Sequence, residues 1–227
     1  MTVIITGTSS GLGRSLVHSF NKKGYETIGI SRSKTPETDY ICDFRSDDEI
    51  TKTFKQVLLD IDKIDYLVLN AGILGEIKKA AKIDNADLLN VFQVNLFSNK
   101  KILDLVVNSS VELKRVIFIS SGASIKAYDG WLSYCLTKGA LNNLASCYAM
   151  ENSGTHFLSL APGVIQTKMQ DVIVKNSEQK FSSILKFKNL YGKNPTPDIV
   201  ANKIVDNLST LSAIESGAYF DLRDIND

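Results

Sequence analysis

The stretch Thr6-Gly7-Thr8-Ser9-Ser10-Gly11-Leu12-Gly13 decides the fold class of this chain. It follows the apolar residues 3–5 and precedes a helical pattern that starts at Arg14. Glycines allow a tight bend and a close approach of the backbone to a ligand, and the free N–H groups and dipole of a helix N-terminus attract anions. We therefore expect a phosphate-binding turn between the first strand and the first helix. A tight turn that binds nothing is the alternative.

Short apolar runs alternate with amphipathic stretches along the whole chain. The runs are rich in Val, Ile and Leu without strict alternation, which is typical of strands buried on both faces of a parallel sheet. The expected strands are residues 3–6, 27–31, 40–42, 66–70, 115–120, 155–161 and 218–222, and the expected helices are residues 14–23, 47–60, 84–108, 132–152, 173–187 and 198–211. This order predicts an α/β fold: a single Rossmann-type, doubly wound domain over residues 1–227. Its mostly parallel seven-stranded sheet should have right-handed crossovers and helices on both faces.

One predicted connection is irregular. Only residues 32–39 separate the second and third expected strands. A parallel crossover usually needs a dozen residues or more. Either the helix is missing there, or one of the two strands is wrong.

Composition excludes several classes of protein. The 227 residues include 26 basic and 25 acidic side chains, and the net charge of +1 favours neither nucleic acid nor an acidic membrane surface as a partner. No apolar run approaches the ~18 residues of a transmembrane helix, and no signal peptide precedes the first strand. The 3 scattered cysteines argue against a disulfide framework, so we expect a cytoplasmic protein. With only 2 histidines, no His-rich metal site is expected.

A second group of residues carries the chemistry. Tyr134 and Lys138 lie four positions apart in a helical pattern, so both face the same side. Ser121 closes a predicted strand thirteen positions before Tyr134, and Asn95 lies in the preceding long helical stretch. With the G-x-x-x-G-x-G spacing of the first turn, this set resembles the short-chain dehydrogenase/reductase family. The segments 130–135 and 161–170 look most like its sepiapterin reductase and benzil reductase subgroup, which reduces carbonyls, often vicinal diketones, with NADPH.

The resemblance implies reduction of a ketone or diketone by hydride transfer. Tyr134 would donate the proton, and Lys138 would lower the tyrosine pKa and hydrogen-bond the nicotinamide ribose. Ser121 would donate a hydrogen bond to the carbonyl oxygen, where negative charge develops. Asn95 would hold a water that links Lys138 to solvent. Each residue also has a structural alternative: a strand-end cap for Ser121, a buried bridge for Asn95 and a core position for Tyr134.

The resemblance also implies a cofactor site along the strand ends. At the end of the second strand an acidic residue would bind the ribose of NAD, whereas Arg32 suits the 2′-phosphate of NADP, so NADP(H) is expected over NAD(H). A solvated surface arginine is the alternative. Asp43 would contact adenine or cap the following helix. The expected cofactor-binding residues are Gly7, Ser9, Ser10, Gly11, Leu12, Gly13, Ser31, Arg32, Asp43, Phe44, Asn70, Ala71, Gly72, Tyr134, Lys138, Pro162, Gly163, Ile165 and Thr167.

Substrate contacts are expected from Ser121, Trp131 and Tyr134. Residues 166–192 would form a lid with an apolar pocket wall or, alternatively, an amphipathic helix packed on the domain. Trp131 would be a pocket floor or a packing residue. The resemblance further implies a homodimer or homotetramer built from the long helices 84–108 and 132–152.

Other functions stay open. Within the same family, the protein could be a 3-oxoacyl thioester reductase or a polyol or sugar dehydrogenase. From another class, it could be a non-catalytic NADP-binding regulatory protein. The presence of Asn95, Ser121, Tyr134 and Lys138 together speaks against that last function.

Overall fold

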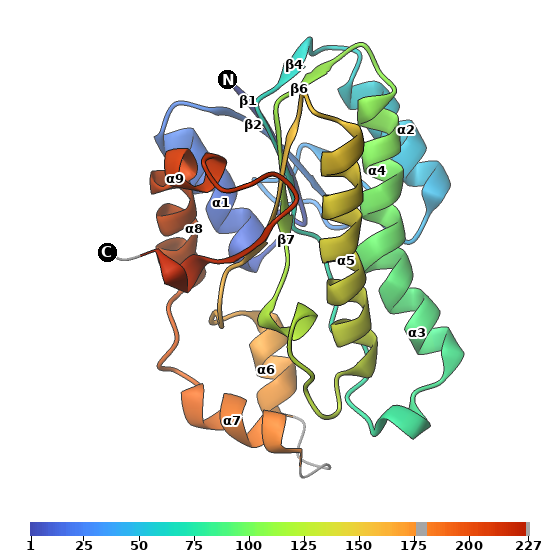
Figure 1. The fold of residues 1–227 in the computed structure, drawn as a ribbon, viewed down its shortest axis with the longest axis vertical. Helices are drawn as coiled ribbons and strands as arrows, with labels where there is room; N and C mark the ends of the chain where they lie inside the picture. The colour runs from blue at the N-terminus through green and yellow to red at the C-terminus, as the bar shows by residue number, and fades with distance from the viewer. Residues whose placement is uncertain (176–180, 226–227) are drawn as a thin grey trace.

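A single parallel sheet forms the centre of the molecule (Figure 1). The computed structural model describes residues 1–175 and 181–225. Within these ranges the sheet has the order β3-β2-β1-β5-β7-β8-β9, and every neighbouring pair is parallel. Its strands are β1 (Thr2–Thr6), β2 (Glu26–Ser31), β3 (Tyr40–Ile41), β5 (Tyr66–Leu69), β7 (Arg115–Ile119), β8 (His156–Ala161) and β9 (Tyr219–Asp221). The predicted seven-stranded α/β fold is confirmed. Because all strands are parallel, their carboxyl ends lie at the same end of the sheet.

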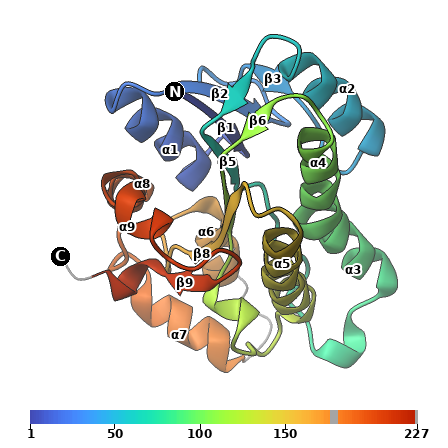
Figure 2. The same ribbon diagram turned by 45° about the horizontal axis from the view of Figure 1, so that its top comes forward.

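Helices cover both faces of the sheet (Figures 1 and 2). One face carries α1 (Gly11–Lys22) and α8 (Pro197–Asp206), which α9 (Leu208–Ser212) follows. The other face carries α2 (Asp47–Val57), α4 (Ser98–Val107) and α5 (Leu132–Glu151), and α3 (Asn85–Phe92) precedes α4. No helix in the described ranges has the length and apolar character needed to cross a membrane.

Alternate residues of each strand supply two separate cores. In β1, Ile4 packs with α2, α4 and α5, whereas Val3 and Ile5 pack with α1 and α8. Both faces of the strand are therefore apolar, which explains why the sequence shows continuous apolar runs instead of alternation.

Two further helices lie beyond the carboxyl ends of the strands, at the bottom of Figure 1. They are α6 (Lys168–Lys175) and α7 (Ser182–Leu190). The predicted helix 173–187 is thus two shorter helices, and its residues 176–180 lie outside the described ranges. Both helices belong to the predicted lid, 166–192.

Residues 32–39 join β2 to β3 without a helix. Thr38 N donates to Thr35 O at 3.0 Å, which closes a turn, and Asp39 N donates to Gly29 O at 2.8 Å. The loop lies so close to β2 that a Cβ on Gly29 would be 2.0 Å from the Glu37 carbonyl oxygen. A carboxylate oxygen of Glu37 also lies 3.1 Å from Nε2 of His18 on α1. Both strand predictions were correct, and the loop itself occupies the space beside β2 and α1.

The predicted helices 84–108 and 198–211 are each interrupted. One π-helical turn, Gln93–Phe97, joins α3 to α4 and contains Asn95; such turns occur frequently at functional sites. The second helix breaks at Asn207, between α8 and α9. A small parallel pair, β4 (Lys63–Ile64) with β6 (Glu112–Leu113), was not predicted because two-residue strands carry no recognisable pattern.

The last crossover also departs from the expected right-handed form. The step from β8 to β9 continues the direction of the step from β7 to β8, whose helix α5 covers one face. The helix α8, however, packs on the opposite face beside α1 (Figure 2). This crossover is therefore left-handed, because α6 and α7 first carry the chain around the end of the sheet.

Candidate active site

The glycine turn lies between β1 and α1, where the sequence predicts a turn. Gly7 has φ 76° and Gly11 has φ 57°, in the left-handed region that favours glycine. A Cβ on Gly13 would lie 2.2 Å from the Gly7 carbonyl oxygen, so a larger residue would push the turn apart. Ser10 is the N-cap residue of α1, but its side chain makes no bond to the helix. The first turn of α1 thus presents its N–H groups to an anion, and the site fits a pyrophosphate.

Asn70 fastens this turn to the neighbouring strand. Its Nδ2 donates to Thr6 O at 2.9 Å and to Gly7 O at 3.3 Å. The N–H groups of Asn70 and Ala71 both donate to Thr6 Oγ1 at 3.0 Å. The next residue, Gly72, brings the backbone to the other end of the site, where its Cβ would be 3.7 Å from Lys138 Nζ.

Three of the four expected catalytic residues meet where β7 ends against α5. Ser121 caps a short turn, and its Oγ accepts a hydrogen bond from Ala123 N at 3.1 Å. The same hydroxyl is hydrogen-bonded to Tyr134 at the start of α5. Lys138, one turn further along, is buried with its Nζ 5.6 Å from the centre of the Tyr134 ring. Its ammonium donates to Ile119 O at 2.6 Å, which holds it at the end of β7.

Burial controls the ionisation of both groups. Burial raises the pKa of Tyr134 to about 12, and the hydrogen bond with Ser121 opposes this rise without cancelling it. Burial lowers the pKa of Lys138 to about 8. The ammonium, which we expected to lower the tyrosine pKa, donates to Ile119 O, and burial dominates the pKa of Tyr134. At neutral pH Tyr134 is therefore a protonated phenol, and Lys138 is mainly a cation.

Asn95 lies next to this group and is completely buried. Its Oδ1 accepts a hydrogen bond from Ile73 N at 2.8 Å, and its Nδ2 donates to Ile73 O at 2.9 Å and to Thr137 Oγ1 at 3.1 Å. The side chain thus ties the π-helical turn to the segment after β5 and to α5. The bridging role considered for Asn95 is present in the structure.

The residues expected at the adenosine end behave differently from one another. Arg32 is exposed, and in the described ranges its guanidinium has neither a hydrogen bond nor a salt bridge. The carboxylate of Asp43 binds Arg45, at 3.0 Å from Nε and 2.5 Å from Nη2, and this guanidinium holds the pKa of Asp43 below its usual value. Ser46, not Asp43, caps α2. The Phe44 side chain is buried and packs in the core.

Sequence reasoning missed Thr38, which links Arg32's loop to the glycine turn. Its buried Oγ1 lies 3.1 Å from Thr8 Oγ1, 2.9 Å from Ser31 Oγ and 3.0 Å from Thr35 Oγ1. Because Ser31 Oγ donates its own hydrogen to Ser33 O at 2.8 Å, Thr38 must donate to Ser31. The signal available in the sequence was a run of hydroxyl residues in a loop too short for a helix.

The segment after β8 reaches the same site. Gly163 in the expected Pro162-Gly163 turn has φ 82°, and Ile165 is buried. The methyl group of Thr167 lies 3.4 Å from the position of a Cβ on Gly11. Thr167 therefore lies against the N-terminus of α1, where the sequence places the phosphates.

An aromatic cluster closes the site from the lid side. Trp131 is 4% exposed, and its ring centre lies 4.8 Å from that of Phe187, 5.1 Å from Tyr128 and 6.2 Å from Tyr134. Other members of the cluster come from α6, from α7 and the residue before it, and from the segment after β5: Leu74, Ile77, Ile173, Phe181 and Ile184. The lid stretch thus packs on the domain and, at the same time, forms an apolar wall beside Tyr134.

Asp129, a second residue that sequence reasoning missed, fastens α7 to this wall. Its carboxylate accepts hydrogen bonds from Ser182 N at 2.7 Å and Ser183 N at 2.8 Å, so it caps a helix that has no side-chain cap of its own. Burial raises the pKa of Asp129, but the bonds from both serines outweigh this and hold it below its usual value. No local pattern could have indicated a cap that comes from more than fifty positions away.

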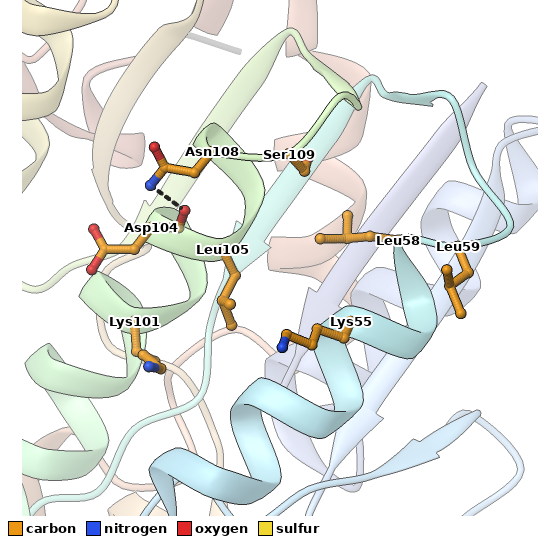
Figure 3. A pocket seen from close by; sticks show the side chains of 8 residues that line it. All are labelled: Lys55, Leu58, Leu59, Lys101, Asp104, Leu105, Asn108 and Ser109. Carbon is orange, nitrogen blue, oxygen red and sulfur yellow. Dashed lines mark hydrogen bonds between the residues drawn. The ribbon is translucent and has the colours of Figure 1, made fainter.

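A groove between α2 and α4 lies near the other end of the sheet, opposite the carboxyl ends of the strands (Figure 3). It is near the C-terminal ends of both helices, so it lies at the amino ends of the strands, away from Tyr134. Its lining residues are Lys55, Leu58, Leu59, Lys101, Asp104, Leu105, Asn108 and Ser109. None of them is an expected site residue.

Comparisons with known proteins agree with this geometry. Residues 1–178 match the model of the family described as short chain dehydrogenase. The chain is 30% identical to a benzil reductase ((S)-benzoin forming) of Bacillus subtilis, over 97% of this chain and 98% of that protein. It is 27% identical to a 3-oxoacyl-[acyl-carrier-protein] reductase of Aquifex aeolicus, over 95% and 83%. A solved short-chain dehydrogenase/reductase of Saccharomyces cerevisiae has the same fold, with a TM-score of 0.88 at 24% identity over 98% and 96%.

The chain belongs to the short-chain dehydrogenase family. It is an oxidoreductase that acts on CH–OH or C=O groups, and it is of the benzil reductase-like kind. The family binds a nicotinamide cofactor. The glycine turn, the uncapped N-terminus of α1 and the close approach of Thr167 fit such a group.

Proposed function

We propose that the protein is an NADPH-dependent reductase of ketones and vicinal diketones, with Tyr134 as the proton donor. The observation that carries this proposal is the placement of Ser121, Tyr134 and Lys138 together beside an apolar aromatic wall. The likeness to benzil reductases, which act on a diketone with two aromatic rings, supports the substrate class. A bound nicotinamide cofactor supplies the hydride.

The side chains of the site divide the remaining work. Tyr134, protonated at neutral pH, donates its hydroxyl proton to the substrate oxygen. Ser121 donates a hydrogen bond to the same oxygen, where negative charge develops. The Lys138 cation stabilises the phenolate left behind and hydrogen-bonds the cofactor ribose. Asn95 positions α5 and the water that returns a proton to Lys138.

Arg32 carries the proposed preference for NADPH. Its guanidinium is exposed and has no bonded partner in the described ranges, so no existing ion pair must break before it binds a phosphate. A 2′-phosphate suits the planar guanidinium fork. The remaining cofactor contacts are those predicted from the sequence, with Asp43 released from Arg45 if it is to reach adenine.

The apolar wall distinguishes the substrate classes. Trp131, Tyr128 and Phe187 offer aromatic faces that suit an aryl ketone. The likeness to a 3-oxoacyl-[acyl-carrier-protein] reductase favours a thioester as the second candidate.

The test is NADPH oxidation at 340 nm with benzil, 1-phenyl-1,2-propanedione and acetoacetyl-coenzyme A. We expect the highest kcat/KM for an aryl diketone, and higher values with NADPH than with NADH. Faster turnover of the thioester would favour the second candidate. Cofactor binding without turnover of any carbonyl or alcohol would favour a non-catalytic binding protein.

We also propose a homodimer or homotetramer that uses α5. This helix exposes Leu136, Asn143, Cys147 and Met150 at spacings of seven, four and three, which places them on one face, and Met150 is 89% exposed. A second copy related by a two-fold axis would cover this apolar face. Light scattering should give twice or four times the 25.0 kDa chain mass, and Met150→Lys should lower it. A monomer for the unaltered chain would contradict the proposal.

A further inference from the structure

Asn142 uses both ends of its amide to hold the strand end that carries Ser121. It lies on α5, two turns beyond Tyr134. Its Oδ1 accepts a hydrogen bond from Ser120 Oγ at 2.6 Å, and its Nδ2 donates to Ser124 Oγ at 2.8 Å. Ser120 and Ser124 flank Ser121 on either side. A single side chain of α5 is therefore hydrogen-bonded to the chain both before and after Ser121.

The hydrogens of this network have only one arrangement. Ser124 Oγ donates to Ser121 O at 2.6 Å, and Ser124 N donates to the same oxygen at 2.9 Å. A hydroxyl has a single hydrogen, so Ser124 Oγ must accept from Asn142. The amide nitrogen of Asn142 therefore faces Ser124, and the bonds run from Asn142 through Ser124 to the backbone of Ser121.

The same helix holds the end of β7 at a third point. Lys138 Nζ donates to Ile119 O at 2.6 Å, one turn before Asn142. The contacts of Lys138 and Asn142 fix residues 119–121 relative to the helix that also presents Tyr134. Without Asn142, only Lys138 and the hydrogen bond between Ser121 and Tyr134 would fasten this corner to α5 by side chains within the described ranges.

We propose that Asn142 is a positioning residue that sets the Ser121 hydroxyl against the Tyr134 hydroxyl. The inference rests on the proposed reductase function, in which both hydroxyls bind the substrate oxygen. Asn142 has no contact with that oxygen, so it acts only through Ser121.

Asn142→Leu removes both bonds with little change of volume. We expect kcat for the carbonyl substrate to fall about 10- to 100-fold, the size of effect that small misplacements of reacting groups produce. The Kd for NADPH should stay within about twofold, since Asn142 is not one of the expected cofactor-binding residues. In the alcohol-oxidising direction, the rising limb of the pH profile should move to higher pH, because Ser121 then lowers the tyrosine pKa less.

Asn21→Leu is the matched control. Asn21 lies near the end of α1 and is exposed, and in the described ranges its one side-chain hydrogen bond comes from Thr27 Oγ1, at 2.9 Å, near the amino end of β2. This variant should keep the kcat and the pH profile of the unaltered protein. Asn142→Asp is a second probe: a carboxylate draws the Ser124 hydrogen away from Ser121 O, so kcat should fall despite the nearly identical shape.

A double-mutant cycle with Ser121→Ala separates positioning from general damage. If Asn142 acts through Ser121, adding Asn142→Leu to Ser121→Ala should cause no further loss of kcat. If the fold-losses of kcat in the two single variants multiply in the double variant, the inference is overturned. An unchanged kcat in Asn142→Leu together with a reduced kcat in Ser121→Ala would also overturn it. In both cases the proposed function would stand. An unimpaired Ser121→Ala would overturn both. If Asn142→Leu does not fold, Ser124→Ala breaks the same path from the loop side and must give the same non-additive loss.

Discussion

The clearest structural prediction concerns Thr38, whose hydroxyl joins the glycine turn to the loop that carries Arg32. Thr38→Val keeps the shape of the side chain and removes its contacts with Thr8, Ser31 and Thr35. Ser31 keeps its own bond to Ser33 O, so its hydrogen remains satisfied. The Thr8 hydroxyl is completely buried, and in the described ranges Thr38 is its only hydrogen-bond partner.

A buried hydroxyl left without a partner costs about 2 kcal/mol. For a domain of this size, that loss corresponds to a fall of about 4–8 °C in Tm. The loop should also hold Arg32 less firmly. We therefore expect the Kd for NADPH to rise about five- to tenfold, which corresponds to ~1 kcal/mol, while the Kd for NADH changes less.

Two measurements check this prediction: thermal unfolding, and fluorescence titration with NADPH and NADH. Thr38→Ser keeps the hydroxyl and loses only a methyl group, so it is the matched control and should stay close to the unaltered protein in both. If Thr38→Val has an unchanged Tm and an unchanged ratio of the two Kd values, the hydroxyl network neither stabilises the loop nor positions Arg32.

Three further substitutions test other parts of the site. Gly13→Ala places a Cβ 2.2 Å from Gly7 O. It should lower the free energy of unfolding by about 1–3 kcal/mol and reduce the rise in Tm that NADPH binding causes. An undiminished rise would contradict the close fit of the turn. Asp129→Ala removes the cap of α7, which contributes about 1 kcal/mol to the free energy of unfolding. The KM for an aryl ketone should rise, while the Kd for NADPH should stay the same. A constant KM would contradict a lid role for α7. Lys138→Met tests the buried cation through urea unfolding between pH 7 and 11. The folded pKa of about 8 lies below the ordinary ~10.5, so the folded state binds fewer protons in that window, and the stability of the unaltered protein should rise with pH relative to the variant, by up to about 3 kcal/mol. Parallel stability curves would show that Lys138 is not desolvated.

The features that were predicted correctly from the sequence are those with a local pattern. Strands such as β1 are apolar on both faces, and the glycine turn has a fixed spacing, so both can be recognised without tertiary information. Tyr134 and Lys138 share a helix face because they are four residues apart, and Ser121 comes two residues after the end of β7.

The features that were not predicted depend on contacts between distant segments. Asp129 caps a helix that starts at Ser182, and Thr38 meets Thr8 across thirty positions. The partner of Lys138 is a backbone carbonyl, Ile119 O, which no side-chain pattern reveals. The left-handed last crossover likewise follows from the path of α6 and α7, not from any property of β8 or β9.

The most direct test of the proposed chemistry is the rate of benzil reduction by NADPH in the unaltered protein and in Tyr134→Phe, with cofactor binding measured on both. Phenylalanine keeps the ring beside Trp131 and removes only the hydroxyl. We predict turnover by the unaltered protein, a loss of about 10²- to 10⁴-fold in the variant, and the same Kd for NADPH in both. Equal turnover by the two proteins would contradict the assignment of Tyr134 as the proton donor.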